Sequence, residues 1–137
     1  MKIYTEPDSL IVRFEGIEKF LAIKNQLVVK KSNIRLMKWH EVLYLSRSDL
    51  GWRVGGVSIP KLIMAGRFAS GSGLNFVYLT NAKNIMALKS ARLDSVLEID
   101  CKDYRYQKLF FTYKDAESAA KIIHWSDVKE TSTPKQT

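Results

Sequence analysis

The sequence predicts a mainly β domain of the α+β class, and three observations support this. Short segments rich in β-branched and aromatic residues recur, several of them alternate apolar with polar side chains, and one helical pattern stands near the C-terminus. With 137 residues, 46% of them hydrophobic, the chain is long enough for one buried core. We therefore expect a single domain over residues 1–125 and a disordered tail over residues 126–137.

The first 30 residues predict a strand, a short helix and a second strand. In Ser9–Phe14 (SLIVRF), alternate apolar residues share one face, as in a strand, and Gly16 ends it. Ile17–Ile23 (IEKFLAI) has apolar residues three and four positions apart, which is typical of a short helix. Gln26–Lys30 (QLVVK) is rich in β-branched residues and begins a series of seven expected strands. The segment before it is thus a short N-terminal strand–helix extension.

Six further strands are expected after this point, joined mostly by short turns as in an antiparallel meander. Arg47–Pro60 holds three glycines and a proline and is expected to be the longest loop. Gly66 interrupts one strand, which indicates a bulge or a close backbone approach. The six strands are His40–Ser46, Lys61–Phe68, Leu74–Thr80, Asn84–Lys89, Ser95–Cys101 and Lys108–Tyr113.

A helix is predicted after the last strand. Asp115 is a suitable N-cap, and the acidic residues at its start and the basic residues near His124 complement the helix dipole. A lone sheet of seven strands would expose an apolar face, so we expect two sheets folded over each other, with the helix capping one end. The apolar stripe that packs on the sheets is expected to comprise Ala116, Ala119, Ala120 and Ile123.

Positive charge is concentrated in the middle of the chain. The net charge is +8, but Lys19–Arg92 alone contains 13 basic residues and only two acidic ones, Glu41 and Asp49. Such a stretch attracts polyanions, so we expect an acidic protein or an anionic membrane surface as the partner, with nucleic acid as the alternative. The basic residues form no run longer than Lys30-Lys31, and solvated positions spread over strands and turns are the other interpretation.

The stretch Arg53–Tyr78 carries a recognisable order of features. A glycine stands before an Ile-Pro step, and a glycine–aromatic pair, a small turn and a strand containing an aromatic follow. These are Gly56, Ile59-Pro60, Gly66 with Phe68, Gly71–Gly73 and Phe76. The order resembles bacterial pleckstrin-homology (PH)-like domains over roughly Leu10–Ile123, although Lys61 stands where a glycine often follows the proline. The resemblance implies a seven-stranded antiparallel two-sheet roll or barrel with a C-terminal capping helix, and a module that binds lipids, peptides or its own copies.

No catalytic, metal or cofactor site is expected, and the chain is not predicted to be an enzyme. Cys101 lies on the inward face of its strand, and neither His40 nor His124 shows a spacing that would pair with it, so a buried, inert thiol is expected. The glycines of Gly66–Gly73 lack the Gly-Lys-Ser/Thr ending of a phosphate-binding loop. Three carboxylates near one turn are expected to be solvated rather than paired for acid–base work: Glu98, Asp100 and Asp103.

An anion site is predicted around the Gly/Pro segment, where glycine-bearing loops can present backbone N–H groups. Its side chains are Arg53, Lys61 and Arg67, and unrelated surface charges are the alternative interpretation. We therefore expect a non-enzymatic binding module with a basic central surface. The sequence has no apolar run long enough for a transmembrane segment and no signal-peptide pattern, so the expected location is cytoplasmic, with peripheral attachment to the membrane as a further alternative.

Two further expectations concern surfaces. Lys108–Tyr113 and Leu74–Thr80 are strongly apolar, and if either strand lies at a sheet edge, strand addition would allow a homo-oligomer. Among the aromatic residues, most are expected in the core, whereas Tyr104 and Tyr106 are expected to be exposed in a turn.

Overall fold

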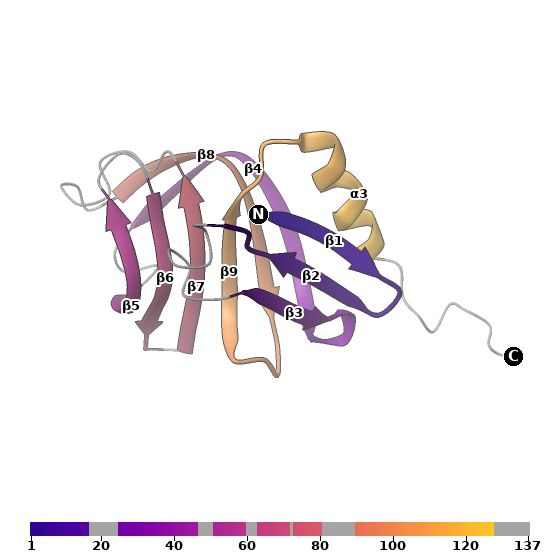
Figure 1. Ribbon diagram of the computed structural model, residues 1–137, viewed down its shortest axis with the longest axis horizontal. Coiled ribbons are helices and arrows are strands. Elements are labelled where there is room, and N and C mark those ends of the chain that lie inside the picture. The colour runs from indigo at the N-terminus through magenta and orange to yellow at the C-terminus, as the bar shows by residue number, and fades with distance from the viewer. Residues whose placement is uncertain (17–24, 47–50, 60–62, 72, 81–89, 128–137) are drawn as a thin grey trace, which may run out of the picture.

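The computed structural model describes residues 1–16, 25–46, 51–59, 63–71, 73–80 and 90–127, which form two sheets and one α-helix (Figure 1). The smaller sheet is antiparallel, with the order β1-β2-β3. The larger sheet is open over the described strands, with the order β4-β8-β9-β7-β6-β5. The predicted mainly β class with one C-terminal helix is confirmed. The bounds are β1 Lys2–Glu6, β2 Ser9–Arg13, β3 Gln26–Lys30, β4 Ile34–Ser46, β5 Trp52–Ile59, β6 Ile63–Ser70, β7 Gly73–Thr80, β8 Ser90–Cys101, β9 Tyr106–Thr112 and α3 Ala116–Asp127.

The strand that replaces a predicted loop is β5. The expectation of a loop over Arg47–Pro60 is wrong for residues 52–59, which pair with β6 in antiparallel register. Backbone hydrogen bonds hold this strand, and the glycines face a partner that fits them, since Gly56 is opposite Gly66. The register shifts between Arg53 and Gly55, as at a bulge. At the N-terminus, β1 is a second strand that sequence patterning did not indicate, whereas the predicted helix Ile17–Ile23 and strand Asn84–Lys89 lie outside the described residues.

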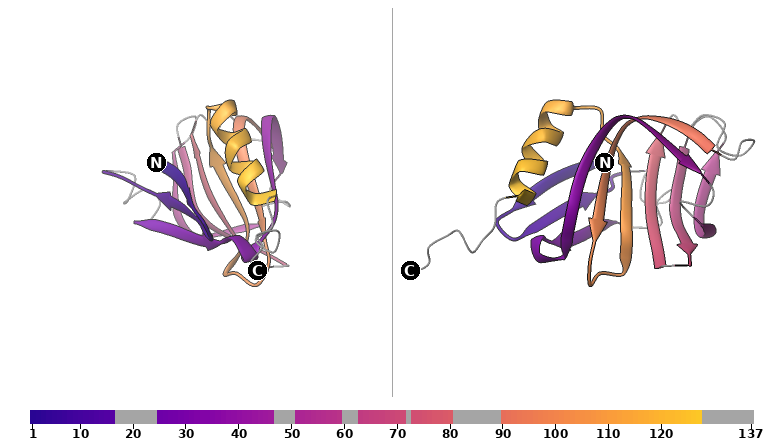
Figure 2. Two further views of the ribbon diagram at one scale, coloured as in Figure 1. Left: turned by 90° about the vertical axis from the view of Figure 1, so that its right-hand side faces the viewer. Right: turned by 180° about the vertical axis from the view of Figure 1, so that it is seen from behind.

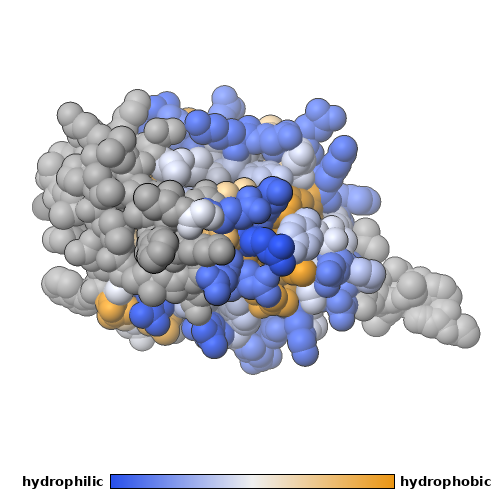
Figure 3. Space-filling model, in the orientation of Figure 1, coloured by the Kyte–Doolittle hydropathy of each residue, from blue (hydrophilic) through white to orange (hydrophobic). Residues whose placement is uncertain are grey.

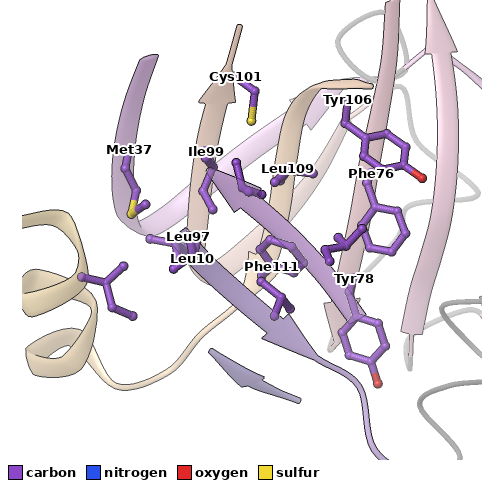
Figure 4. Packing of buried hydrophobic residues seen from close by; sticks show 14 of the residues in the cluster. Leu10, Met37, Phe76, Tyr78, Leu97, Ile99, Cys101, Tyr106, Leu109 and Phe111 are labelled. Carbon is purple, nitrogen blue, oxygen red and sulfur yellow. The ribbon is translucent and has the colours of Figure 1, made fainter. Parts of the chain in front are cut away.

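The first hydrophobic core lies between the two sheets. Phe14 from the segment after β2 packs against the rings of Phe76 (centroids 5.9 Å apart) and Tyr78 (5.3 Å), and Phe76 also contacts Tyr106 (5.4 Å). Figure 4 shows Phe76, Tyr78 and Tyr106 in one column, with Leu109 and Phe111 lying between them and Leu10 of β2. Phe76 is fully buried, as expected for most of the aromatic residues, whereas the exposure expected for Tyr106 is wrong, because its ring is buried as well.

The second hydrophobic core comes from a bend in the pair β4 and β8. Residues 90–94 of β8 do not pair with β9, and here β4 and β8 arch across β7 and β6, in front of them in the right-hand view of Figure 2. Ser95 in this bend has a φ of 57°. The arch covers apolar side chains on the outer side of the larger sheet, away from the smaller one. The enclosed residues are Leu45, Phe68, Val77, Leu79, Leu93, Val96 and Phe110.

The expected antiparallel meander is wrong at the centre of the larger sheet. β9 lies between β7 and β8 and pairs in parallel with β7, with Phe76 opposite Leu109. Both β7 and β9 carry buried side chains on both faces, which favours central positions. Neither Lys108–Tyr113 nor Leu74–Thr80 is therefore an edge strand, and the condition for a homo-oligomer through either of them is not met. The outermost strands of the larger sheet over the described residues are β4 and β5.

The helix α3 begins at its predicted cap and contacts β4 and β1, the outermost strands on that side of the two sheets (Figure 2). Asp115 Oδ1 accepts hydrogen bonds from the N–H groups of Glu117 and Ser118 at 3.1 Å, so the predicted N-cap is confirmed. The predicted apolar stripe is only partly right. Alanines lie on several sides of the helix, so the sequence does not show which side packs on the sheets, and the buried side differs from the predicted one. Ala119 and Ile122 are buried and Ile123 is partly buried, whereas Ala116 and Ala120 are exposed. The helix continues to Asp127, and the rest of the predicted tail lies outside the described residues.

Candidate functional site

The anion site predicted from the sequence falls on β5 and β6, and the structure describes one of its three side chains. Arg67 is exposed opposite Gly55, and its guanidinium lies over that glycine, where a Cβ would stand 2.9 Å from Nη2. Arg53 belongs to β5 and pairs with Phe68, but its side chain is not described, and Lys61 lies outside the described residues. Arg53 and Arg67 are thus on neighbouring strands, and the three-residue site stays a prediction.

A larger group of cations lies where two turns distant in sequence meet. One is the 3-10 turn η1 (Lys31–Asn33) between β3 and β4, and the other joins β8 to β9. The Asn33 side chain donates hydrogen bonds to the carbonyls of Lys102 (3.0 Å) and Asp103 (3.2 Å), and the Lys102 N–H donates to the Asn33 carbonyl (2.8 Å). The β1–β2 turn joins the group, since the Lys31 N–H donates to the Asp8 carbonyl (2.8 Å). Backbone contacts therefore hold three turns together at one end of the sheets.

We call the five cations on and beside the η1 and β8–β9 turns the basic tip. Four are exposed and one is partly buried. Figure 3 shows hydrophilic side chains along the lower and lower right edge of the molecule, where Figure 1 places these turns. Over the described residues, none of the five lies within ion-pair distance of a carboxylate, unlike Lys2, Arg92 and Lys108. The neighbouring acids are Glu6, Asp8 and Asp103, and the cations are Lys30, Lys31, Arg35, Lys102 and Arg105.

An indole borders the basic tip. Trp125, from the last turn of α3, donates a hydrogen bond from Nε1 to the Glu6 carbonyl (3.1 Å). The Lys31 ammonium lies 5.0 Å from the centroid of the Trp125 ring, a cation–π contact. The ring is partly buried, with the remainder open to solvent. An indole beside lysines suits the boundary between a membrane and water, where tryptophan is enriched.

A separate polar network crosses the outer face of β4, β8 and β9. His40 Nε2 donates to Glu98 Oε1 (2.7 Å), and Lys108 Nζ donates to Glu98 Oε2 (3.1 Å) and lies 3.6 Å from Asp100. The Glu98 side chain is only 14% exposed, so the expected solvated carboxylate is wrong at this position. Sequence analysis missed this network because it depends on how the strands pair. Asp100 pairs with Lys108 of β9, and Val96, two residues before Glu98 on the same face of β8, pairs with His40 of β4.

Opposing effects set the pKa of Glu98. Burial raises it, but hydrogen bonds from His40 and Lys108 and their charges outweigh burial, so the pKa lies below its ordinary 4.5. For Lys108, burial lowers the pKa, but the hydrogen bond and charge of Glu98, with a further contribution from Asp100, raise it above its ordinary value. The Glu98 contribution to stability is thus present above pH 4.5 and is lost as the pH falls through the lower, folded pKa.

We expect Glu98→Gln to destabilise the fold at neutral pH by about 2 kcal/mol, because it removes the charge from two charge-assisted hydrogen bonds. The difference from the parent protein should shrink as the pH falls from 4.5 through the lower, folded pKa, because the carboxylate of the unfolded parent protein is then protonated and unfolding takes up a proton. Urea unfolding at pH 7 and pH 3.5 measures both values. The matched control is Asp94→Asn, which breaks the half-exposed pair with Arg92 and should change stability by less than about 0.5 kcal/mol. An equal deficit for Glu98→Gln at both pH values would contradict the role of the charge.

The remaining sequence expectations concern single residues. Cys101 is buried as predicted, and burial, aided by the Asp100 charge, raises its pKa to about 12. Tyr104 is partly buried rather than exposed, and burial raises its pKa to about 12. In the parts of the chain described above, no three of the His, Cys, Asp and Glu side chains gather as potential metal ligands. No helix described there is both long and apolar enough to cross a membrane.

Comparison with known proteins yields no relative. No family model, no curated protein and no solved structure matches this chain. Any function must therefore be argued from the geometry described above, with the basic tip and the polar network as its two largest groups of charged side chains.

Proposed function

We propose that the protein is a non-enzymatic binding module that attaches to an anionic membrane surface through the basic tip. The observation that carries this proposal is the set of five cations on adjoining turns, none paired with a carboxylate of the described residues. A cation without an ion-pair partner can approach a phosphate group without first breaking an ion pair. The fixed turns also hold the five charges together, so an extended anionic surface meets several of them at once.

The apolar neighbours of the basic tip favour a lipid surface over other anions. Trp125 lies beside Lys31, and Leu36, which follows Arg35, is 44% exposed. Each cation near an anionic bilayer contributes about 1 kcal/mol, so five give at most roughly 5 kcal/mol. Repulsion of the neighbouring Glu6, Asp8 and Asp103 reduces this value, so we expect weak attachment that salt weakens further. Nucleic acid is less favoured, because most large aromatic side chains of the described residues, which would stack on bases, are buried or partly buried, Tyr4 and Tyr44 excepted.

We also propose that the domain is of the PH-like type. Supporting this are the two sheets, the C-terminal helix beside them and the seven described strands from β3 to β9. One of these strands, β5, is not among the seven expected, and the open larger sheet has a parallel pair. In this proposal the basic tip takes the role of the anion-binding surface, and the anion site predicted at Arg53, Lys61 and Arg67 is kept as a second candidate.

The test of the basic tip is flotation with vesicles. The protein is mixed with vesicles of neutral lipid alone or with 30% anionic lipid, at about 0.05 M and 0.5 M salt, conditions that span the screening range. We expect recovery with anionic vesicles at low salt only. The variant Lys30→Glu/Lys102→Glu changes one exposed tip residue on each turn and should weaken binding about thirtyfold or more, given about 1 kcal/mol per cation.

A matched control makes the same change of net charge elsewhere. Arg13→Glu/Lys114→Glu alters two exposed cations at the opposite ends of β2 and β9 and should bind like the parent protein. Equal weakening by both variants would mean that net charge alone drives binding and would overturn the basic tip as a site. Binding lost only in Arg53→Glu/Arg67→Glu would move the function to the second anion site. Gel retardation of DNA or RNA without vesicle binding would favour nucleic acid instead.

A further inference from the structure

The outermost strand β5 has one backbone edge without a partner among the described strands. Of these strands it pairs only with β6, whereas β4, the outermost strand on the other side, also contacts α3, which lies far from β5 in Figure 1. The pairing of β5 is regular over residues 55–59, beyond the register shift near its start. Edge strands are commonly protected by lysine or proline, and β5 (WRVGGVSI) contains neither. The outer N–H and C=O groups of β5 can therefore bind a further strand.

An arginine of β6 reaches across to this edge. Arg67 is opposite Gly55 in the register, and its guanidinium lies in the space that a side chain of residue 55 would fill. A Cβ at Gly55 would stand 2.9 Å from Nη2 and 3.5 Å from Nε of Arg67, so a larger residue would displace the guanidinium. Arg67 is exposed and lies within ion-pair distance of no carboxylate of the described residues. A charge that belongs to the second strand is thus held over the outermost one.

The charges on β5 and β6 decide which kind of strand fits this edge. The two strands contain two arginines, Arg53 and Arg67, and no acidic residue. A second copy joined through β5 would bring four arginines to one seam, between chains of net charge +8 that repel each other. We propose instead that an extended, acidic segment of another protein adds to β5 as a further strand, and that Arg67 binds its carboxylate. Such a segment brings the opposite charge to the edge.

Strand addition fixes the position of that carboxylate. In a pair of neighbouring strands, directly opposed residues share one face of the sheet, with Cβ atoms about 4.5–5.5 Å apart. The residue of the added strand opposite Gly55 therefore lies on the face where the guanidinium of Arg67 covers this glycine. A glutamate or aspartate there can accept two parallel hydrogen bonds from the guanidinium. Backbone hydrogen bonds hold the segment whatever its sequence, and Arg67 selects an acidic residue at one position.

Binding of synthetic peptides to the full chain tests this proposal. The probe has eight residues, the length of β5, and alternates threonine and valine around one central glutamate. Fluorescence anisotropy measures its dissociation constant at about 0.15 M salt. We expect the same peptide with a central lysine to bind about tenfold more weakly, because it sets two cations against each other. Proline at alternate positions of the glutamate peptide should abolish binding, since proline removes N–H donors from the added strand.

Variants of the edge show whether Arg67 is responsible. Arg67→Glu should exchange the preference, so that the lysine peptide binds more tightly than the glutamate peptide, a result that loss of structure cannot produce. Gly55→Ala should remove the preference for glutamate while both peptides still bind, because the added Cβ displaces only the end of a flexible side chain. The matched control is Arg13→Glu on β2, which makes the same change of net charge at another exposed arginine and should keep the parent's preference.

Several results would overturn the proposal. No binding of the glutamate peptide, or equal affinity for the glutamate and lysine peptides, would mean that the edge does not recognise an acidic strand. Equal effects of Arg67→Glu and Arg13→Glu would mean that net charge alone attracts the peptide. Amide hydrogen exchange that the peptide slows in β3 or β4 rather than in β5 would place it at another edge. A mass of twice 15.7 kDa without peptide, with β5 protected from exchange, would place a second copy there instead. None of these variants alters the basic tip, so vesicle binding and peptide binding are tested independently.

Discussion

Replacing Phe76 by alanine is expected to lower the free energy of unfolding by about 4 kcal/mol. Phe76 is fully buried at the centre of the larger sheet, and its ring lies 5.4 Å from the Tyr106 ring and 6.2 Å from the Phe111 ring. The substitution removes these aromatic contacts and leaves a cavity that strands on both sides of β7 cannot close. Urea unfolding followed by tryptophan fluorescence measures the loss.

Two further variants show whether the cavity is responsible. Phe76→Leu retains most of the volume and should lose less than half as much stability. Val28→Ala removes a side chain of β3 that is 42% exposed and should change the unfolding free energy by less than about 1 kcal/mol. A loss under about 1 kcal/mol for Phe76→Ala would mean that Phe76 is not central to the core.

Replacing Gly51 by alanine is expected to cost about 3 kcal/mol, the second largest effect among our predictions. Gly51 precedes β5 and has a φ of 93°, in the region that favours glycine. A Cβ there would overlap the carbonyl oxygen of Ala69 and stand 2.8 Å from the Cα of Ser70. Because these are backbone atoms of β6, relief requires the start of β5 to move away from its partner. The melting temperature and the unfolding free energy should both fall.

Two other glycines separate the causes of this effect. Gly16 has a φ of 58° but nothing within 4 Å of a Cβ, so Gly16→Ala tests backbone strain alone and should cost about 1 kcal/mol. Gly71 also has open space around a Cβ, and Gly71→Ala should be nearly neutral. If Gly51→Ala lost no more stability than Gly16→Ala, the close approach to β6 would be refuted.

The local sequence pattern predicted the elements of the fold that depend on residues close together in the chain. Alternating residues in Ser9–Phe14 and Ser95–Cys101 predicted strands, and β2 and β8 confirm them. Asp115 was identified as an N-cap because its carboxylate bonds N–H groups only two and three residues away. The buried state of Cys101 followed from the same alternation along β8.

Strand pairing decided what the local pattern could not. β5 has two glycines that weaken any strand prediction, and only its antiparallel partner β6 supplies the hydrogen bonds that stabilise it. The parallel pair of β7 and β9 joins strands separated by β8 in sequence, and no residue within either strand encodes that neighbour. The helix packs through Ala119 and Ile122 rather than the predicted stripe, because the surfaces of β1 and β4 select the face.

The candidate sites divide in the same way. The sequence by itself determined that the middle of the chain is strongly basic, since charge is a sum over residues. Where cations gather depends on contacts between distant segments: Asn33 and Lys102 are 69 positions apart, and their hydrogen bond creates the basic tip. Glu98 likewise became a paired carboxylate only when β4 and β9 brought His40 and Lys108 to its two oxygens. The composition and the short-range periodicity could therefore be read from the sequence, whereas the candidate sites could be located only in the tertiary structure. The reason is that hydrogen bonds and ion pairs act over a few ångströms of space, whatever the distance between the residues along the chain.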